Sequence, residues 1–460
     1  MTTVRRRTQL LLASTFYGAV TLAAALDAGL LPAADRRLLV VANTAAVPET
    51  TPALDEAPGF EALRARFDGV LSWNDTIRPF HPSGWSPRPD DAPLWERHLR
   101  LLWGLGTAEA PDEITVVLES LQVSPASAVA RIFADAPLHA YADGLMSYGP
   151  TRTKLDPLVG TRVTQLLHPD LVPGLRPLLL GEFGVPARTV PADVLTKVFG
   201  EVADAAATAL PPVPEGTALL LGQYLSALDI LTPAEEEALY ARMLRGAVAR
   251  GHREVVFKPH PSAPARFRRL LADEADRLGA RLTVADAPVP AETLFARARP
   301  ALVVACFSTA LFTARALYGL PVAACGTDLL LERLTPYENS NRVPVTLTDA
   351  LLPRLEGDGP PPDPGPVPDV AGLLAAVGYT MQPQVRPDLR AAAERHLAAH
   401  PDAARTRRWF KRRRLAALGL PGAPVPAPLA RLPRHPAVRR AARRARAAYR
   451  RVRAGLGVAS

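Results

Sequence analysis

The strongest constraint on the fold is an alternation that runs twice along the chain, in which short apolar segments are followed by longer alanine- and leucine-rich segments. This alternation is typical of parallel β-sheets covered by helices. We therefore expect an α/β fold. The first series predicts strands at 8–13, 38–42, 69–73 and 114–119 and helices at 18–30 and 95–105. The second predicts strands at 218–221, 254–258, 281–284, 301–305 and 321–324 and helices at 233–249, 265–278 and 309–318.

A proline-rich stretch, LPPVPEG at residues 210–216, separates the two series. A chain of 460 residues also exceeds the size at which one hydrophobic core keeps growing. We expect two Rossmann-like domains facing a cleft, the first over 1–210 and the second over 217–418, followed by a proline-rich and then arginine-rich tail over 419–460. Within the second domain, residues 387–418 predict one helix that crosses back over the domains.

Positive charge is concentrated near the C-terminus. Seven basic residues lie between Arg405 and Arg414, and ten arginines lie between Arg431 and Arg453, without an acid in either segment. Removing these seventeen from the net charge of +9 leaves the rest of the chain at about −8. A nucleic-acid-binding protein with a basic surface throughout is not expected from this distribution.

The arginine-rich tail has two leading interpretations. A basic helix between Arg431 and Arg453 suits an anionic membrane surface and would hold a peripheral protein there. A solvated tail fits the same residues equally well, because alanines give the apolar face little hydrophobic contact. Nucleic-acid binding ranks last, since few aromatic residues lie among the arginines.

The remaining composition favours a cytoplasmic protein. Cys306 and Cys325 lie in apolar stretches and need no disulfide, which fits a reducing compartment. The apolar segment near the N-terminus is interrupted at Ser14, Thr15 and Tyr17, so we interpret it as strand, loop and helix rather than as a secretory signal.

The first loop that suggests chemistry contains Asp143 and Gly144. A carboxylate next to a glycine can approach a substrate hydroxyl closely and accept its proton. Taken alone, the same pair is also a common turn with a solvated carboxylate.

The second loop, Lys258-Pro259-His260-Pro261, directly follows a predicted strand. The two prolines restrict the backbone on both sides of the histidine. A histidine held at the carboxyl end of a strand can donate to a phosphate oxygen of a leaving group. The alternative is a histidine hydrogen-bonded to a nearby carbonyl.

The third loop ends in Ser308 and Thr309 at the start of a predicted helix, where hydroxyls and free backbone N–H groups form an anion site or an ordinary helix cap. Glu292 lies between the second and third loops and can accept hydrogen bonds from a ribose or begin a helix. Gly222 and Gln223 follow the first strand of the second series and are further candidates at the cleft.

These three loops, in this order, resemble the motifs of the bacterial sialyltransferases of GT-B fold, especially the alpha-2,8-polysialyltransferase-like family. That family has an acidic-Asp-Gly motif, then a His-Pro motif, then a Ser-Ser/Thr motif. Here Asp143-Gly144, His260-Pro261 and Ser308-Thr309 match, whereas Ala142 replaces the first acid. The opening sequence QLLLASTFYG at residues 9–18 also looks like the family's first strand and loop. The likeness spans about residues 8 to 350.

The resemblance implies roles for these residues. Asp143 would be the general base on the acceptor hydroxyl, His260 would stabilise or protonate the departing CMP phosphate, and Ser308 and Thr309 would hold that phosphate. Glu292 would bind the cytidine ribose. The remaining candidates are Lys258, Gly222 and Gln223 on the donor side and Ser14, Thr15, Asn74 and Gly144 as sugar contacts.

The expected activity is inverting transfer of a sialic acid or related nonulosonic acid from a CMP-activated donor to a glycan or lipid-linked glycan, with no cofactor or metal required. Two alternatives stay open. One is a transferase of the same fold that uses another nucleotide-activated donor, and the other is a catalytically inactive GT-B-like binding protein tethered to a membrane.

Overall fold

The computed structural model describes residues 5–107, 109–260, 263–355, 369–400 and 408–423, and these residues form two parallel β-sheets. The seven-stranded first sheet has the order β3-β2-β1-β4-β5-β6-β7, and the five-stranded second sheet has the order β10-β9-β8-β11-β12. The strands of the first sheet are β1 (Arg7–Ala13), β2 (Arg36–Val41), β3 (Gly69–Ser72), β4 (Glu113–Leu118), β5 (Leu138–Tyr141), β6 (Val163–Pro169) and β7 (Ala187–Val190). Those of the second are β8 (Ala218–Leu221), β9 (Glu254–Lys258), β10 (Arg281–Val284), β11 (Leu302–Ala305) and β12 (Val322–Ala324).

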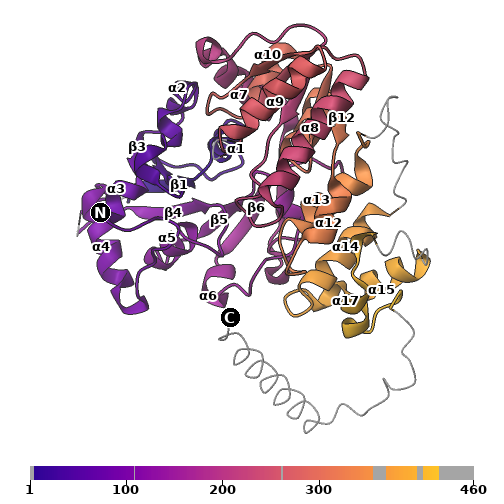
Figure 1. The fold of residues 1–460 in the computed structure, drawn as a ribbon. Helices are drawn as coiled ribbons and strands as arrows, with labels where there is room; N and C mark the ends of the chain where they lie inside the picture. Colours follow the sequence, from indigo (N-terminus) through magenta and orange to yellow (C-terminus); the bar gives the residue numbers. More distant parts are fainter. Residues whose placement is uncertain (1–4, 108, 261–262, 356–368, 401–407, 424–460) are drawn as a thin grey trace, which may run out of the picture.

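Helices cover both sheets, as the alternation in the sequence predicts (Figure 1). Those that follow strands of the first sheet are α1 (Phe16–Asp27), α2 (Glu61–Arg64), α3 (Trp73–Ile77), α4 (Ala92–Leu102), α5 (Ala126–Ile132), α6 (Pro157–Gly160) and α7 (Ala192–Ala205). Those in and after the second sheet are α8 (Pro233–Ala249), α9 (Arg266–Arg277), α10 (Glu292–Ala298), α11 (Thr309–Tyr318), α12 (Thr327–Arg333), α13 (Arg342–Leu351), α14 (Val370–Met381), α15 (Arg390–Ala399) and α17 (Arg412–Leu418). The α/β fold class is confirmed.

Every strand expected from the sequence is present, with ends within two residues of the prediction. Three strands were not expected: β5, β6 and β7. They lack a clean apolar run, since β6 contains the polar residues Gln165 and His168 on buried positions and β7 begins with three exposed residues.

The strand order reverses between β1 and β4 in the first sheet and between β8 and β11 in the second. In open α/β sheets, the loops at the carboxyl ends of strands beside such a reversal form the ligand crevice. The loops after β1, β4 and β5 therefore face the site from the first sheet, and those after β8, β9 and β11 from the second.

Helix α7 closes the first domain and also packs on the second. It contacts α1 and α2 on one side and α10 and α11 on the other, and Figure 1 shows it beside α10. The two sheets are thus joined by a helix contact as well as by the segment that precedes β8.

The single helix predicted over residues 387–418 is wrong. The segment forms a short turn at Pro387–Leu389, then α15, which ends at Ala399, and then α17. His400 after α15 has φ −121° and ψ 66°, outside the helical region, because it precedes a proline whose ring disfavours helical geometry. Contact with the first domain is made just before this segment, where Gln382 donates to the carbonyl of Arg152 and Arg386 to that of Leu178.

The tail predicted over 419–460 lies outside the described residues from residue 424 onward, and so do residues 356–368. Within the part of the chain that the structure describes, no helix is both long and apolar enough to cross a bilayer.

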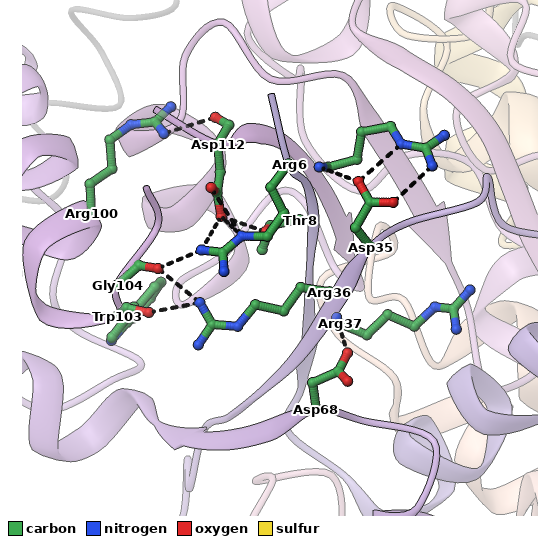
Figure 2. Close-up of polar contacts among 11 residues, drawn as sticks. Arg6, Thr8, Asp35, Arg36, Arg37, Asp68, Arg100, Trp103, Gly104 and Asp112 are labelled. Carbon is green, nitrogen blue, oxygen red and sulfur yellow. Dashed lines mark hydrogen bonds and ion pairs between the residues drawn. The ribbon is translucent and has the colours of Figure 1, made fainter. Parts of the chain in front are cut away.

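The amino ends of β1, β2 and β4 are fixed by arginine–aspartate contacts (Figure 2). Asp112 is buried and accepts hydrogen bonds from Thr8 Oγ1 at 2.6 Å and Arg6 Nε at 3.0 Å. Arg6 and Arg36 both donate to the carbonyl of Gly104. This edge lies at the opposite end of the strands from the crevice, so its contribution is to stability.

We expect Asp112→Ala to lower the free energy of unfolding by about 1–3 kcal/mol, because it removes the acceptor of the buried Thr8 hydroxyl and of Arg6 Nε. Urea unfolding measures the change. Asp75→Ala is the control, since Asp75 pairs with Arg78 on the surface, where both side chains are more than two-thirds exposed, and such pairs contribute about 0–1 kcal/mol. Equal effects of the two substitutions would contradict the assignment.

Candidate active site

Ser14 and Thr15, in the loop after β1, each hold one carboxylate. Thr15 caps the N-terminus of α1, where its hydroxyl accepts a hydrogen bond from Gly18 N at 2.9 Å and donates one to Asp143 Oδ2 at 2.9 Å. Ser14 donates from its backbone N at 3.0 Å, and from its hydroxyl, to Glu119 Oε1. The structure therefore brings the two predicted loop residues directly onto acids of neighbouring strand ends.

Asp143 lies two residues beyond β5 and is half-buried. Burial raises the pKa of its carboxyl, while the Thr15 hydroxyl acts in the opposite direction by donating to the ionised form. A carboxylate with a raised pKa is a stronger base than a solvated aspartate, which suits proton removal from a hydroxyl.

A cavity of about 140 Å³ opens beside this carboxylate. Glu119, Asp143, Arg152 and Ser340 are among the residues that line it. Arg152 donates to Ser340 Oγ at 2.7 Å, which links the first domain to the segment before α13. The cavity therefore contains two carboxyl groups and a cation that is held by a hydrogen bond.

Gly144 and Thr309 bring the two domains into contact at the site. The backbone N of Leu145 donates to Thr309 Oγ1 at 3.4 Å. A Cβ on Gly144 would lie 2.7 Å from the same oxygen, so only glycine fits at this position without movement. The Asp143 loop thus reaches the N-terminus of α11 from the other sheet.

We expect Gly144→Ala to lower the free energy of unfolding by about 1–3 kcal/mol, because the added methyl forces the domains apart at a well-packed contact. Thr309→Ala in the same protein removes the clashing oxygen, so the double variant should be destabilised less than the sum of the two single variants. Gly200→Ala in α7 is the control, as a Cβ there meets no atom within 4 Å. Thermal unfolding of the wild type, the two single variants, the double variant and the control measures these changes. Strict additivity of the effects of Gly144→Ala and Thr309→Ala would contradict the contact.

Ser308 is the N-cap of α11, and its hydroxyl accepts a hydrogen bond from Ala310 N at 3.2 Å. The backbone of the first turn faces the crevice with the partial positive charge of a helix N-terminus. Ser308 and Thr309 are both half-buried. This arrangement agrees with a phosphate site, and the role itself stays a prediction.

His260 follows β9 and packs against Tyr224, with ring centroids 3.9 Å apart and an interplanar angle of 37°. Burial, and then the positive charge of Lys258, lower the pKa of His260 to about 4. The imidazole is therefore neutral at neutral pH in the free protein and offers one N–H donor.

Tyr224 and Glu236 are site residues that the sequence reasoning missed. The Glu236 carboxylate is buried and accepts from Leu225 N at 3.0 Å, Ser226 N at 2.8 Å and Tyr240 Oη at 2.6 Å. Glu236 thereby fixes the loop after β8, and this loop carries Tyr224, whose ring packs against that of His260. Tyr224 could have been found from the sequence, because it directly follows the strand-end pair Gly222-Gln223.

Gly222 and Gln223 organise the strand ends of the second sheet. Gly222 N donates to the carbonyl of Lys258 at 2.8 Å, and a Cβ on Gly222 would lie 3.2 Å from Pro259 Cα. Gln223 Oε1 accepts from Phe307 N at 3.2 Å, which ties the loop after β8 to the loop after β11.

Lys258 and Glu292 are largely internal. Lys258 Nζ donates to the carbonyl of Ala287 at 2.9 Å, and burial lowers the pKa of its ammonium to about 8, against the effect of Glu292 and Asp286. Glu292 is 2% exposed and accepts from Thr313 Oγ1 at 2.6 Å, and burial raises the pKa of its carboxyl. One Glu292 oxygen is thus already paired, and its predicted ribose contact stays a prediction.

Asn74 makes a structural contact with Asn43, which follows β2. Its Oδ1 accepts from Asn43 N at 2.8 Å and its Nδ2 donates to the carbonyl of Asn43 at 2.9 Å. Both ends of the amide therefore hold the loop after β2, and its sugar contact remains a prediction. Among the described residues, no three His, Cys, Asp or Glu side chains gather as a metal site requires.

Two parallel α/β sheets, with the Asp143 loop of one domain reaching a helix N-terminus of the other, have the two-domain architecture of the GT-B glycosyltransferases. The model of the family "Alpha-2,8-polysialyltransferase (POLYST)" matches residues 9–327. The chain belongs to this family.

Solved structures with a similar fold include sialyltransferases. The GT-B domain of the Photobacterium damselae sialyltransferase is 11% identical, with 74% of this chain and 96% of that chain covered and a TM-score of 0.38. The 2,6-sialyltransferase of Photobacterium sp. JT-ISH-224 is 11% identical, with 74% of this chain and 75% of that chain covered and a TM-score of 0.37. The UDP-GlcNAc 2-epimerase of Methanocaldococcus jannaschii is 12% identical, with 69% of this chain and 83% of that chain covered and a TM-score of 0.41. The comparison with curated proteins finds no match.

Proposed function

We propose that the protein transfers a sialic acid or related nonulosonic acid from a CMP-activated donor to a hydroxyl of a glycan, with inversion at the anomeric carbon. The observation that carries this proposal is the contact of the Asp143 loop with the N-terminus of α11, where Leu145 N donates to Thr309 Oγ1. It supports a carboxylate from one domain acting beside a helix N-terminus of the other that would bind the phosphate. Membership of the polysialyltransferase family supports the same donor class.

In this mechanism Asp143 removes the proton of the acceptor hydroxyl, whose oxygen forms a bond to the anomeric carbon as the bond from that carbon to the phosphate oxygen breaks. CMP leaves from the opposite face, which inverts the configuration. The charge that develops on its phosphate is stabilised by the N–H of His260, the Ser308 hydroxyl and the N-terminus of α11. CMP departs with a single phosphate, so these groups suffice in the proposal without a cofactor or divalent cation.

The proposal also includes a location. We place the enzyme in the cytoplasm, with a glycan or lipid-linked glycan as acceptor and with the arginines between Arg431 and Arg453 on an anionic membrane surface. This part rests on the sequence alone, because the tail lies outside the described residues.

Nucleotide-dependent thermal stabilisation tests the donor class. A ligand that binds only the folded protein stabilises it by about 2.7 kcal/mol at a hundredfold excess over its dissociation constant. We expect CMP to raise the melting temperature of the full-length protein more than CDP, UMP or UDP does. Preference for UDP or CDP would favour another nucleotide-activated donor, and no shift with any nucleotide would favour an inactive binding protein.

A further inference from the structure

Glu119 is a buried acid at the site to which neither the sequence motifs nor the proposed mechanism gives a role. It directly follows β4, which pairs with β5, so its carboxylate and that of Asp143 come from adjacent strand ends. Its side chain is about nine-tenths buried, and it lines the same cavity as Asp143.

The two carboxylates are tied together by consecutive residues. Glu119 accepts from the backbone N and the hydroxyl of Ser14, while Asp143 accepts from the hydroxyl of Thr15. Thr15 also caps α1, so its hydroxyl has a fixed direction. Any shift of the Ser14 backbone therefore moves the donor that orients Asp143.

We propose that Glu119 is a positioning residue that acts through Asp143: it fixes the Ser14-Thr15 turn, and its negative charge strengthens Asp143 as a base. This inference rests on the proposed function for its effect on turnover. Ala142 stands where the family motif has a first acid, and Glu119 brings a second carboxylate to the site from the neighbouring strand.

The electrostatics of the pair agree with this role. Burial, and then the charge of Asp143, raise the pKa of Glu119 to about 7. Two carboxyl groups that share a site titrate as a pair, and ionisation of one opposes ionisation of the other. Among the described residues, the titratable or charged groups near the pair are Tyr141 from β5, Tyr17 from α1, Glu292 from α10 and Arg152, which lines the same cavity.

The sign of the expected change follows from these charges. Glu119→Gln keeps an oxygen that accepts from Ser14 but removes a negative charge beside Asp143. Because the charge of Asp143 raises the pKa of Glu119 to about 7, Glu119 loses its proton after Asp143 has ionised. The kcat/KM of the wild type should therefore rise further near pH 7, as the charge of Glu119 appears beside Asp143, and Glu119→Gln should abolish this rise. Asp143 also becomes the weaker base, so the plateau of kcat/KM should fall roughly tenfold.

The experiment compares pH profiles of transfer for the full-length wild type, Glu119→Gln and Glu119→Asp, with Glu113→Gln as the control. Glu113 is exposed at the opposite end of the same strand, so its substitution should leave the profile unchanged. A Glu119→Gln protein whose profile keeps the rise near pH 7 would overturn the proposal. A residue with only a structural role would lower the plateau and leave that rise in place.

A second measurement needs no turnover. In protein labelled with ¹³C at the glutamate carboxyls, the signal that disappears in Glu119→Gln should titrate near neutral pH, and Asp143→Asn should move its midpoint to lower pH. A midpoint that Asp143→Asn leaves in place would contradict the pairing. If the wild type transfers no sugar from a CMP donor, the proposed function fails, and this titration still decides whether Glu119 and Asp143 act as a pair.

Discussion

Asp143→Asn is expected to lower the kcat of glycosyl transfer by about 10²–10⁴-fold, because the amide cannot accept the proton of the acceptor hydroxyl. The substitution preserves the shape of the side chain and an oxygen for the Thr15 hydroxyl, which donates to Asp143 at 2.9 Å. The fold and the CMP-induced rise in melting temperature should therefore persist.

Steady-state kinetics and thermal stabilisation by CMP, measured on the same preparation, separate these two effects. Asp193→Asn provides the control, since Asp193 is exposed in the first turn of α7. If Asp143→Asn kept a tenth or more of the wild-type kcat, Asp143 would not be the base.

His260→Ala is expected to reduce kcat by about 10²–10³-fold, which is the typical cost of removing one donor to a developing oxyanion. It should also reduce the stabilisation by CMP, because the imidazole N–H is the donor that we assign to the phosphate. Burial and Lys258 lower the pKa of His260 to about 4. The free enzyme therefore holds a neutral ring around neutral pH, and its affinity for CMP should not change there through His260.

Isothermal titration with CMP at several pH values near neutrality measures both expectations. His98→Ala on the exposed face of α4 is the control. An affinity for CMP that the His260→Ala protein retains in full would show that the phosphate is bound elsewhere. Tyr224→Phe should behave as wild type, because it retains the ring that packs against His260 at 3.9 Å.

Most of the fold was predictable because short apolar runs mark several strands of the second sheet, such as ALLL in β8 and LVVA in β11. The predicted ranges for β8, β9 and β10 coincide with the observed ones, as do those for α8 and α11. Strands β5 to β7 escaped prediction because packing between the sheet and its helices, rather than local hydrophobicity, places polar residues such as His139 inside. The end of α15 within the helix predicted over 387–418 was missed because the prediction did not consider that the proline at position 401 disfavours helical geometry at His400.

The site was predictable only where its residues form compact motifs. His260 and Ser308-Thr309 stand in short loops after predicted strands, so the strand-end rule finds them. Asp143 was found from the Asp-Gly pair itself, because β5 before it was not predicted. Their contacts were not foreseeable, as Thr15 and Asp143 are 128 positions apart. Glu119 had a signal that was not used, since it is an acid at the carboxyl end of a predicted strand. Glu236 had none, because it lies within a helix and acts on a loop ten residues before it.

The central claim is transfer from a CMP-activated nonulosonic acid, and a direct assay tests it most sharply. The full-length protein is incubated with CMP-sialic acid and a sialylated oligosaccharide, CMP release and product mass are followed, and the anomeric configuration of the product is determined by NMR. We expect acceptor-dependent CMP release and a product with one or more added sialic acids in the configuration opposite to that of the donor. Transfer from a UDP-activated sugar but not from CMP-sialic acid, or a product that retains the donor configuration, would contradict it.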